Sequence, residues 1–416
     1  MPFCVSMGPP AVGFHSSNMN EPGLKTIFSS VGQEDDSNNK NYLPAEVDGK
    51  GPSGAQKKAD AVTSEVLWAC DLRDLSVEEG GEDWERLLSV LTEAERDKVM
   101  RFRQWDDQKR AFLSIQLQRC LIRTFTGLVS DDMYGILRTR ENKPYAVCDN
   151  LSLGTWNYNV SHHGNYVAIA SHAKNIIGVD VMTLHPPVRK RRPVQAALQS
   201  EIAQDPTVAQ AVVDEAFFES FKAHFTDREM EAVRAHASRD ARYAMFFLTW
   251  SLKEAFVKAV GKGIAMNLCN SEFDISISAG RLDGTPGRAH LSGTANLYLG
   301  GRRRTDWKFR FLALDQDHVL SLGLGPLGEV VDSFASGAWR DVKKEELVRC
   351  ADEVLSDENL HDSHDSTSVH HAPDGKGSGD KRANAGRRGA TVVLHKRSIK
   401  SLFSPLNAAL LNSTAL

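Results

Sequence analysis

The chain has 416 residues, a formal net charge of −4 and a hydrophobic content of 41%. This composition is sufficient for a buried core of one large or two medium domains, and the negative charge argues against a nucleic-acid-binding protein. No apolar run approaches the roughly 20 residues of a membrane-spanning helix, so we expect no membrane partner.

The six cysteines are scattered along the chain, with neither C-x-x-C pairs nor the spacing of a zinc site. A reducing compartment therefore fits best, and we predict a cytoplasmic location. The N-terminus lacks the basic-then-apolar layout of a secretory signal, and its first thirty residues contain Lys25 but no Arg. Organelle targeting has weak support and stays open.

Both ends of the chain have the composition of disordered segments. Residues 1–62 are rich in Gly, Pro, Ser, Asn and Asp, and residues 328–416 are dominated by polar residues as far as Arg388. We predict that both are disordered tails. The Pro-rich basic segment at residues 185–193 then divides the remainder into a first half, residues 63–184, and a second half, residues 185–327.

The first half is predicted to contain one strand, then helices, then further strands. In chain order these are a strand at 64–70, helices at 84–91 and 91–125, a turn at 139–144 that leads to residues 145–148, and strands at 159–171 and 176–182. Asp180 is the only charged residue of the last strand. A buried carboxylate is costly unless it is paired or metal-bound, and the alternative is a strand-end Asp that bonds a backbone amide.

The second half is predicted to be helical first and then to form a sheet. Residues 194–245 are helical, Thr226 and Glu229 form a capping box, residues 246–264 form a helix, and strands follow at 271–278, 289–299, 305–314 and 318–324.

The helix at 246–264 has an apolar face that charges interrupt in one place. Glu254 and Lys258 lie one turn apart, with Lys253 beside them, so a carboxylate and two ammonium groups can meet one anionic ligand. The alternative is an ordinary solvated Glu-Lys pair.

Several motifs occur together in a fixed order, namely NYNVSHHGNYVAIAS, GVDVM, FTDREM, FFLTWSLKEAFVKAVGKGI and SEFDIS. In combination they resemble the 4'-phosphopantetheinyl transferase superfamily. The resemblance is to its larger Sfp-like type, in particular the eukaryotic L-aminoadipate-semialdehyde dehydrogenase-phosphopantetheinyl transferases, and covers about residues 67–324. It implies an α+β fold of two similar α/β halves related by pseudo-twofold symmetry, with the active site in the cleft between them.

The resemblance places Mg2+ on Asp180 and Glu254, one carboxylate from each half. This agrees with the way Mg2+ usually shares its octahedron between one or two carboxylates, waters and substrate phosphates. Bacterial relatives often have an acidic residue two positions after the Asp, where this chain has Met182. A thioether does not replace a carboxylate on a hard cation, so we expect a water in that place.

Coenzyme A is the co-substrate that the resemblance implies, and its phosphates require cationic partners. The cofactor-binding residues carried over are Arg138, Thr139, Arg140, Glu141, Asn142, Lys143, Asn159, Val160, Ser161, His162, Glu254 and Lys258. A further family arginine falls on Lys98, with Arg96 as a rival. Lys253 is predicted either to contact phosphate or to support the helix, with equal weight.

The implied activity is that of a holo-[acyl-carrier-protein] synthase. It transfers 4'-phosphopantetheine from coenzyme A to a serine of an apo acyl, aryl or peptidyl carrier protein and releases adenosine 3',5'-bisphosphate. This post-translational modification would serve fatty acid and polyketide biosynthesis and lysine metabolism. Asp180, Glu254 and Lys258 would be catalytic, with the general base open between Glu254 and a Mg2+-bound water. We expect a monomer.

Two other functions compete with this one. An inactive coenzyme A-binding scaffold should have lost the metal carboxylates, yet both are present. A nucleic-acid-binding protein could use the RKRR segment at residues 189–192 and the arginines at 302–304, but the chain lacks an interleaved aromatic and basic stripe. We therefore expect no nucleic-acid partner.

Overall fold

A computed structural model describes residues 65–128, 130–149, 151–186, 206–263, 266–283, 286–343, 394–397 and 402. All of them belong to one of the two compact units of the chain, and the other unit, residues 7–63, lies outside the described residues. The predicted disorder of residues 1–62 falls on that undescribed part. Within the described part, no helix is long and apolar enough to cross a membrane.

The first half follows the predicted order, except that it has two additional strands at 135–138 and 144–147 and that two predicted elements are each divided in two. Its elements are β1 (Glu65–Asp71), α2 (Glu82–Leu88), α3 (Glu93–Met100), α4 (Trp105–Thr126), β2 (Gly135–Arg138), β3 (Pro144–Val147), β4 (Asn157–His163), β5 (Tyr166–His172) and β6 (Ile176–Thr183). The single helix predicted over 91–125 is two helices, because Gln104 is extended and starts a new helix. The single strand predicted over 159–171 is a hairpin, because Gly164 turns the chain with a φ of 54°.

From Pro206 onward the second half is helical and then forms strands, as predicted, whereas most of the predicted linker and the start of the predicted helical segment, residues 187–205, lie outside the described residues. Its elements are α5 (Pro206–Glu219), α6 (Asp227–Arg234), α7 (Arg239–Val260), β7 (Ser271–Ala279), β8 (Ser292–Leu299), β9 (Arg302–Ala313) and β10 (His318–Gly325). The capping box of Thr226 and Glu229 is confirmed at the start of α6. Helix α7 starts seven residues before the helix predicted over 246–264 and ends at Val260, and it is capped by Gly261, whose φ of 85° suits glycine.

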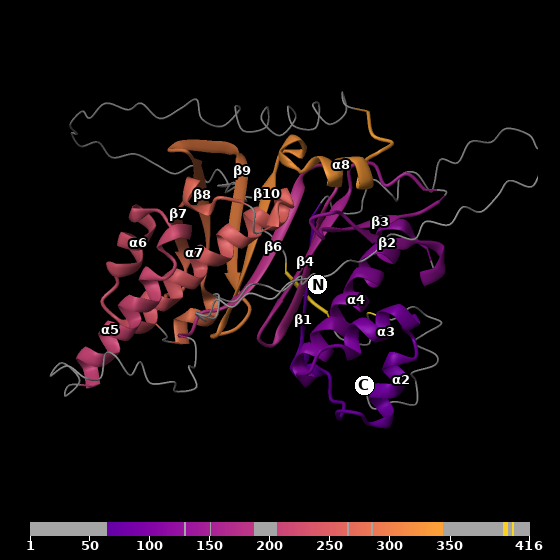
Figure 1. The fold of residues 1–416 in the computed structure, drawn as a ribbon, viewed down its shortest axis with the longest axis horizontal. Helices are drawn as coiled ribbons and strands as arrows, with labels where there is room; N and C mark the ends of the chain where they lie inside the picture. Colours follow the sequence, from indigo (N-terminus) through magenta and orange to yellow (C-terminus); the bar gives the residue numbers. More distant parts are fainter. Residues whose placement is uncertain are drawn as a thin grey trace, which may run out of the picture. The chain divides into compact units, whose positions relative to one another are not determined.

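With a further strand, β11 (His395–Lys396), the strands form a four-stranded sheet in the order β11-β1-β5-β4, a five-stranded sheet in the order β6-β10-β9-β8-β7, and the β2-β3 hairpin. Helices and sheets are thus both present, as the α+β prediction requires. Strand β6 lies in the predicted first half but pairs antiparallel with β10, so it is an edge strand of the second sheet. Helix α7 packs against β6 and β10, and Figure 1 shows it running across this sheet.

Side chains join the two larger sheets where their edge strands β4 and β6 meet. On β4, every second residue accepts a hydrogen bond from a backbone amide of β6. These bonds run from Ile177 N to Asn157 Oδ1 (3.1 Å), from Val179 N to Asn159 Oδ1 (2.9 Å) and from Val181 N to Ser161 Oγ (3.1 Å). Amide and hydroxyl oxygens therefore replace the carbonyl groups of a neighbouring strand, and the buried amides of β6 are satisfied.

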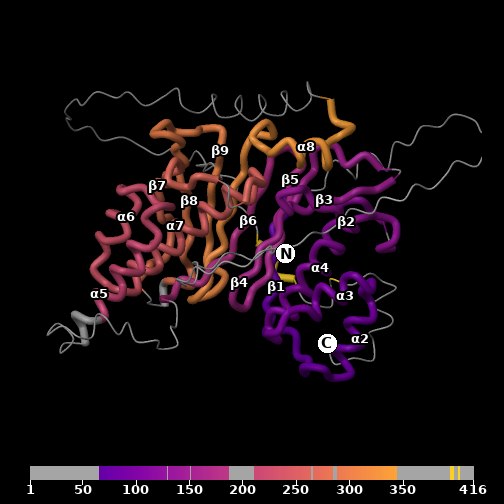
Figure 2. Tube along the Cα trace, in the orientation of Figure 1, coloured from indigo at the N-terminus to yellow at the C-terminus, as the bar shows by residue number. Residues whose placement is uncertain are grey.

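The two halves contain the same helical unit. In each, an eight-residue helix with a threonine capping box precedes a 22-residue helix that starts thirteen residues after that threonine, Thr92 or Thr226. Each long helix ends at a left-handed glycine, Gly127 or Gly261. In Figure 2 these units are α3 with α4 and α6 with α7.

The two helical units also share an ion pair, which is buried in the second unit and partly exposed in the first. The glutamate of each capping box, Glu95 or Glu229, pairs with the fifteenth residue of the following long helix, Arg119 or Lys253. The pair links the start of the short helix to the middle of the long one. The same contact at the same position in both halves indicates a structural role.

The predicted disorder of residues 328–416 is wrong for the described parts of that segment. Helix α8 (Asp332–Ala338) buries Phe334 and is followed by the buried Trp339. Strand β11 (His395–Lys396) pairs with β1, and the buried Leu402 packs in the core of the first half. Composition averaged over a polar segment concealed these few apolar residues, each of which fills a place in a core. The rest of the segment lies outside the described residues.

Candidate active site

The site begins with a close approach between α7 and β6. A Cβ atom placed on Gly178 would lie 1.9 Å from the carbonyl oxygen of Ala255 and 2.5 Å from the amide of Ala259. Only glycine therefore fits at this position of β6. Because the helix lies directly on the strand, the polar residues of α7 reach Asp180, two residues after Gly178.

Three side chains from three elements meet at Asp180. Its side chain is fully buried, and Oδ1 accepts hydrogen bonds from Lys258 Nζ (2.6 Å) on α7 and from Ser161 Oγ (3.1 Å) on β4. Lys258 Nζ also lies 2.9 Å from Ser161 Oγ. The strand-end alternative for Asp180 is thus not what the structure has, since its carboxylate is paired with Lys258 of α7.

Glu254 lies one turn before Lys258 on α7 and is 9% exposed. Burial raises the pKa of its carboxyl group to about 7, the positive charge of Lys258 opposes the rise, and the charge of Asp180 adds to it. Asp180 and Lys258 are therefore its electrostatic neighbours. A second carboxylate in such surroundings is stabilised by a cation.

The residues of this site fit a magnesium ion. Asp180 Oδ2 is buried without a hydrogen-bond partner among the described residues, so the carboxylate has an oxygen to offer. Glu254 supplies a second carboxylate, and Mg2+ commonly takes only one or two from a protein. Across the described ranges there is no cluster of three or more His, Cys, Asp or Glu side chains that could hold a metal. These two carboxylates suit a Mg2+ site that waters and substrate oxygens complete.

Comparison with known proteins gives the family. A sequence model of the N-terminal part of 4'-phosphopantetheinyl transferases matches residues 79–174, and one of the superfamily itself matches residues 176–322. A phosphopantetheinyl transferase of Thraustochytrium sp. is 30% identical over 279 residues, which is 64% of this chain and 83% of that protein. The chain belongs to the 4'-phosphopantetheinyl transferase superfamily.

Two further relatives are L-aminoadipate-semialdehyde dehydrogenase-phosphopantetheinyl transferases. The protein of Rattus norvegicus is 26% identical and that of Homo sapiens 25% identical, each over 243 residues. Both alignments cover 58% of this chain and 69% of the relative. The resemblance that the motifs indicate is therefore confirmed, and the chain is a 4'-phosphopantetheinyl transferase.

Lys253 lies apart from the Asp180 cluster. Its ammonium group is buried in the second half, 2.9 Å from Glu229, and donates to the carbonyl oxygens of Leu268 and Ser271. Burial lowers the pKa of Lys253 and raises that of Glu229, and the attraction between the two charges opposes both shifts. Two roles were predicted for Lys253, contact with phosphate and support of the helix, and these contacts favour support of the helix.

The turn predicted to grip coenzyme A is well ordered by its own hydrogen bonds. Thr139 N donates to Lys143 O (2.9 Å), and Lys143 N donates to Thr139 Oγ1 (3.1 Å). Arg138 Nη1 reaches Asn142 O at 3.0 Å, and Asn142 has a φ of 71°. Arg138 and Arg140 are exposed, whereas the ammonium group of Lys143 is buried and donates to Ala259 O on α7 (2.5 Å).

The second predicted contact segment lies on β4. Asn159 and Ser161 point towards β6 and accept hydrogen bonds from its backbone amides. Val160 and His162 alternate with them along β4 and are partly exposed. Lys98 is exposed on α3, and its rival Arg96 pairs with Glu85 at 2.6 Å.

Sequence reasoning missed three features of the site. The first is the side-chain ladder, for which the alternation of Asn157, Asn159 and Ser161 is a signal in retrospect. The second is the contact of Ser161 with both Asp180 and Lys258. The third is the burial of the ammonium group of Lys143, which no local pattern indicates.

Proposed function

We propose that the protein catalyses the Mg2+-dependent transfer of 4'-phosphopantetheine from coenzyme A to a serine of an apo acyl or peptidyl carrier protein. The products are the holo carrier protein and adenosine 3',5'-bisphosphate. The observation that carries the proposal is the cluster in which Asp180 of β6 meets Lys258 of α7, with Glu254 one turn away. Family membership alone would not assign these residues.

The fold arrangement is part of the proposal. We propose two halves, residues 63–184 and 185–327, related by a pseudo-twofold axis, with coenzyme A in a cleft between them. The repeated helical unit, with its capping box, 22-residue helix and ion pair, supports this symmetry. Only the second copy carries a carboxylate and an ammonium group at these two helix positions, because Glu254 and Lys258 correspond to Cys120 and Thr124 of α4.

In the proposed reaction, Asp180 and Glu254 would hold Mg2+, which would supply charge stabilisation for the pyrophosphate. Lys258 donates hydrogen bonds to Asp180 and Ser161 in the protein without substrate. When the cofactor binds, its ammonium group neutralises the charge that develops as the phosphorus–oxygen bond to adenosine 3',5'-bisphosphate breaks. The carrier serine attacks phosphorus, and its proton passes to Glu254 or to water.

The direct test is intact-mass measurement of an apo carrier protein incubated with the purified chain, coenzyme A and Mg2+. We expect the carrier to gain one phosphopantetheine at its serine, and no gain with chelator or with the Ser→Ala carrier. A carrier whose mass stays constant, while a transferase of known activity modifies it, would contradict the proposal. Coenzyme A binding without transfer would instead support the inactive scaffold.

Lys258→Ala is expected to lower the transfer rate far more than the affinity for coenzyme A. Lys258 stabilises charge that develops only in the transition state. The loss of such an interaction lowers the transfer rate more than the affinity for coenzyme A. Losing one such donor typically costs about 2.7–4 kcal/mol, or roughly a hundredfold in turnover, beside an affinity change nearer tenfold.

Single-turnover kinetics and calorimetric titration of coenzyme A measure the two effects separately. Lys262→Ala is the control, because this lysine is exposed just beyond the end of α7. Normal turnover at saturation combined with a binding loss of several hundredfold would make Lys258 a cofactor clamp.

A further inference from the structure

Helix α8 lies beyond residue 322, where the match to the superfamily ends. The start of α8 lies beside the C-terminal end of α7, since Val331 N donates a hydrogen bond to Val260 O at 3.1 Å. A Cβ atom on Gly261 would meet Lys143 Cδ at 3.3 Å and Val331 Cγ2 at 3.4 Å. Three segments far apart in the sequence, the 138–143 turn, the end of α7 and the start of α8, therefore meet at Gly261.

Lys143 holds two of these segments together. Its buried ammonium group donates to Ala259 O (2.5 Å) and lies 4.6 Å from the centre of the Phe334 ring. Ala259 is in the last turn of α7, where carbonyl groups lack helical donors and a positive charge is favourable. The ring adds a cation–π contact. Burial lowers the pKa of Lys143 to about 7.

Helix α8 also contacts the turn directly. Ser333 Oγ donates a hydrogen bond to Glu141 Oε2, and this bond holds the pKa of Glu141 below its usual range. Phe334 is fully buried and packs edge-on against Tyr145, with ring centres 6.3 Å apart. A Cβ atom on Gly337 would touch the same tyrosine ring at 2.9 Å, so the helix lies close against β3.

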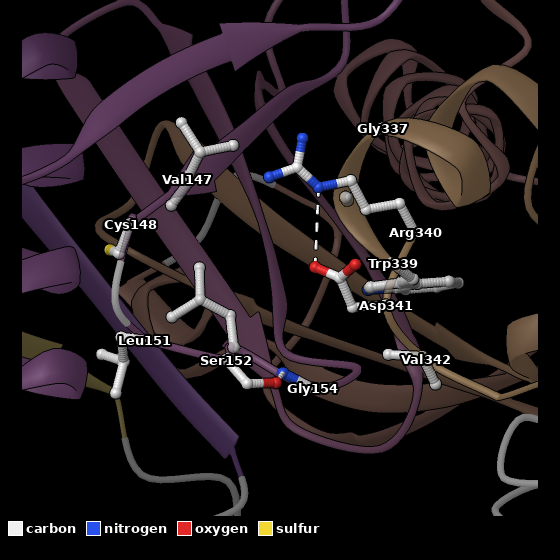
Figure 3. A pocket seen from close by; sticks show the side chains of 13 residues that line it. Val147, Cys148, Leu151, Ser152, Gly154, Gly337, Trp339, Arg340, Asp341 and Val342 are labelled. Atoms are coloured by element: carbon white, nitrogen blue, oxygen red, sulfur yellow. Dashed lines mark hydrogen bonds and ion pairs between the residues drawn. The ribbon is translucent and has the colours of Figure 1, made fainter. Parts of the chain in front are cut away.

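Beyond Gly337 the contact opens into a pocket (Figure 3). Val147, Cys148 and Leu151 line one side of this pocket, and Trp339 and Val342 line the opposite side. Ser333 and Phe334 of α8 contact the turn, through Glu141 and Lys143 respectively.

We infer that α8 is a clamp that fixes the 138–143 turn in the shape that takes the nucleotide end of coenzyme A, with Ser333, Phe334 and Lys143 as positioning residues. The inference rests on the proposed function. It assigns the contacts with the cofactor's phosphates to the exposed Arg138 and Arg140, while Lys143 acts through the turn. Because Ala259 directly follows Lys258, the clamp also sets the turn in register with the catalytic part of α7.

The clamp is tested with Ser333→Ala and Phe334→Leu, measured for coenzyme A affinity by calorimetry and for KM and kcat in carrier modification. A loosened turn must be ordered again on binding, so we expect affinity to fall and KM to rise by about three- to tenfold, with kcat within about twofold. Ser333→Thr keeps the hydroxyl and should restore wild-type values. Ser336→Ala, on the exposed side of α8, is the matched control.

A second variant separates positioning from phosphate binding at Lys143. Lys143→Met keeps the length of the side chain, and we expect weaker coenzyme A binding with the wild-type dependence on salt, since no phosphate contact is lost. A shallower salt dependence would make Lys143 a phosphate ligand and overturn this part of the inference. Faster hydrogen exchange at the amides of residues 139–143 in Ser333→Ala is expected with or without cofactor.

Failure of the clamp differs from failure of the proposed function. Wild-type binding and transfer, with Ser333→Ala and Phe334→Leu unchanged in affinity, KM and exchange, would overturn the clamp alone. A wild-type chain that binds no coenzyme A would overturn both the proposed function and the clamp's role in cofactor binding.

Discussion

Asp180→Asn is expected to abolish carrier modification while leaving a folded protein. Asparagine keeps the shape of the side chain and can still accept the hydrogen bond of Ser161 at its Oδ1 position. It removes the negative charge that pairs with Lys258 and that would bind Mg2+. A loss of about 4 kcal/mol of charge stabilisation corresponds to roughly a thousandfold in rate.

Glu254→Gln should have an effect of the same order, because the two carboxylates belong to one proposed metal site. Asp240→Asn is the control, since this aspartate is exposed at the start of the same helix. Turnover would be measured at saturating Mg2+, alongside thermal unfolding and calorimetric titration of Mg2+ in the presence of coenzyme A. Turnover near that of the wild type in either variant would contradict the metal assignment.

Most elements of the two halves are predictable because their signals are local. The apolar spacing of α7, the Gly261 stop and the capping box of α6 each lie within a few residues, and the structure has all three. The break between α3 and α4 and the hairpin at Gly164 were missed because a continuous apolar pattern conceals a turn. The approach of α7 to β6 at Gly178 depends on tertiary contact, which only the resemblance to a family anticipated.

In the candidate site, too, residues with a local sequence signal were predicted, whereas roles that depend on tertiary contacts were not. Asp180, Glu254 and Lys258 are unusual in their own segments, and the structure brings them together. The assignments of Lys143 and Lys253 depend on which partner each ammonium group meets, and that partner lies more than a hundred residues away for Lys143. For Lys253 the local pattern allowed a ligand or a structural role, and the partner Glu229 belongs to the preceding helix.

Lys253→Met is expected to destabilise the fold while sparing the chemistry of the folded fraction. The lysine and Glu229 are both buried, and removing one partner of such a pair leaves an uncompensated charge, which costs about 3–5 kcal/mol in the free energy of unfolding. At the scaling typical of domains of about 150–250 residues, that corresponds to roughly 6–20 °C in the unfolding midpoint. Calorimetric or optical melting measures the loss, and coenzyme A affinity at low temperature should stay within about threefold.

The double variant Lys253→Met/Glu229→Gln tests whether the uncompensated charge of Glu229 causes this loss of stability. The amides of Thr226 and Phe273 donate to different oxygens of Glu229, and glutamine keeps an acceptor for only one of them. Because glutamine carries no charge, the double variant should nevertheless regain part of the stability lost by Lys253→Met alone. Arg119→Met breaks the equivalent pair of the first half and should cost less, because Glu95 is 20% exposed and can be hydrated. Native stability of Lys253→Met together with a hundredfold loss of coenzyme A affinity would instead make Lys253 a phosphate ligand, and the repeated ion pair would then have diverged in function between the two halves.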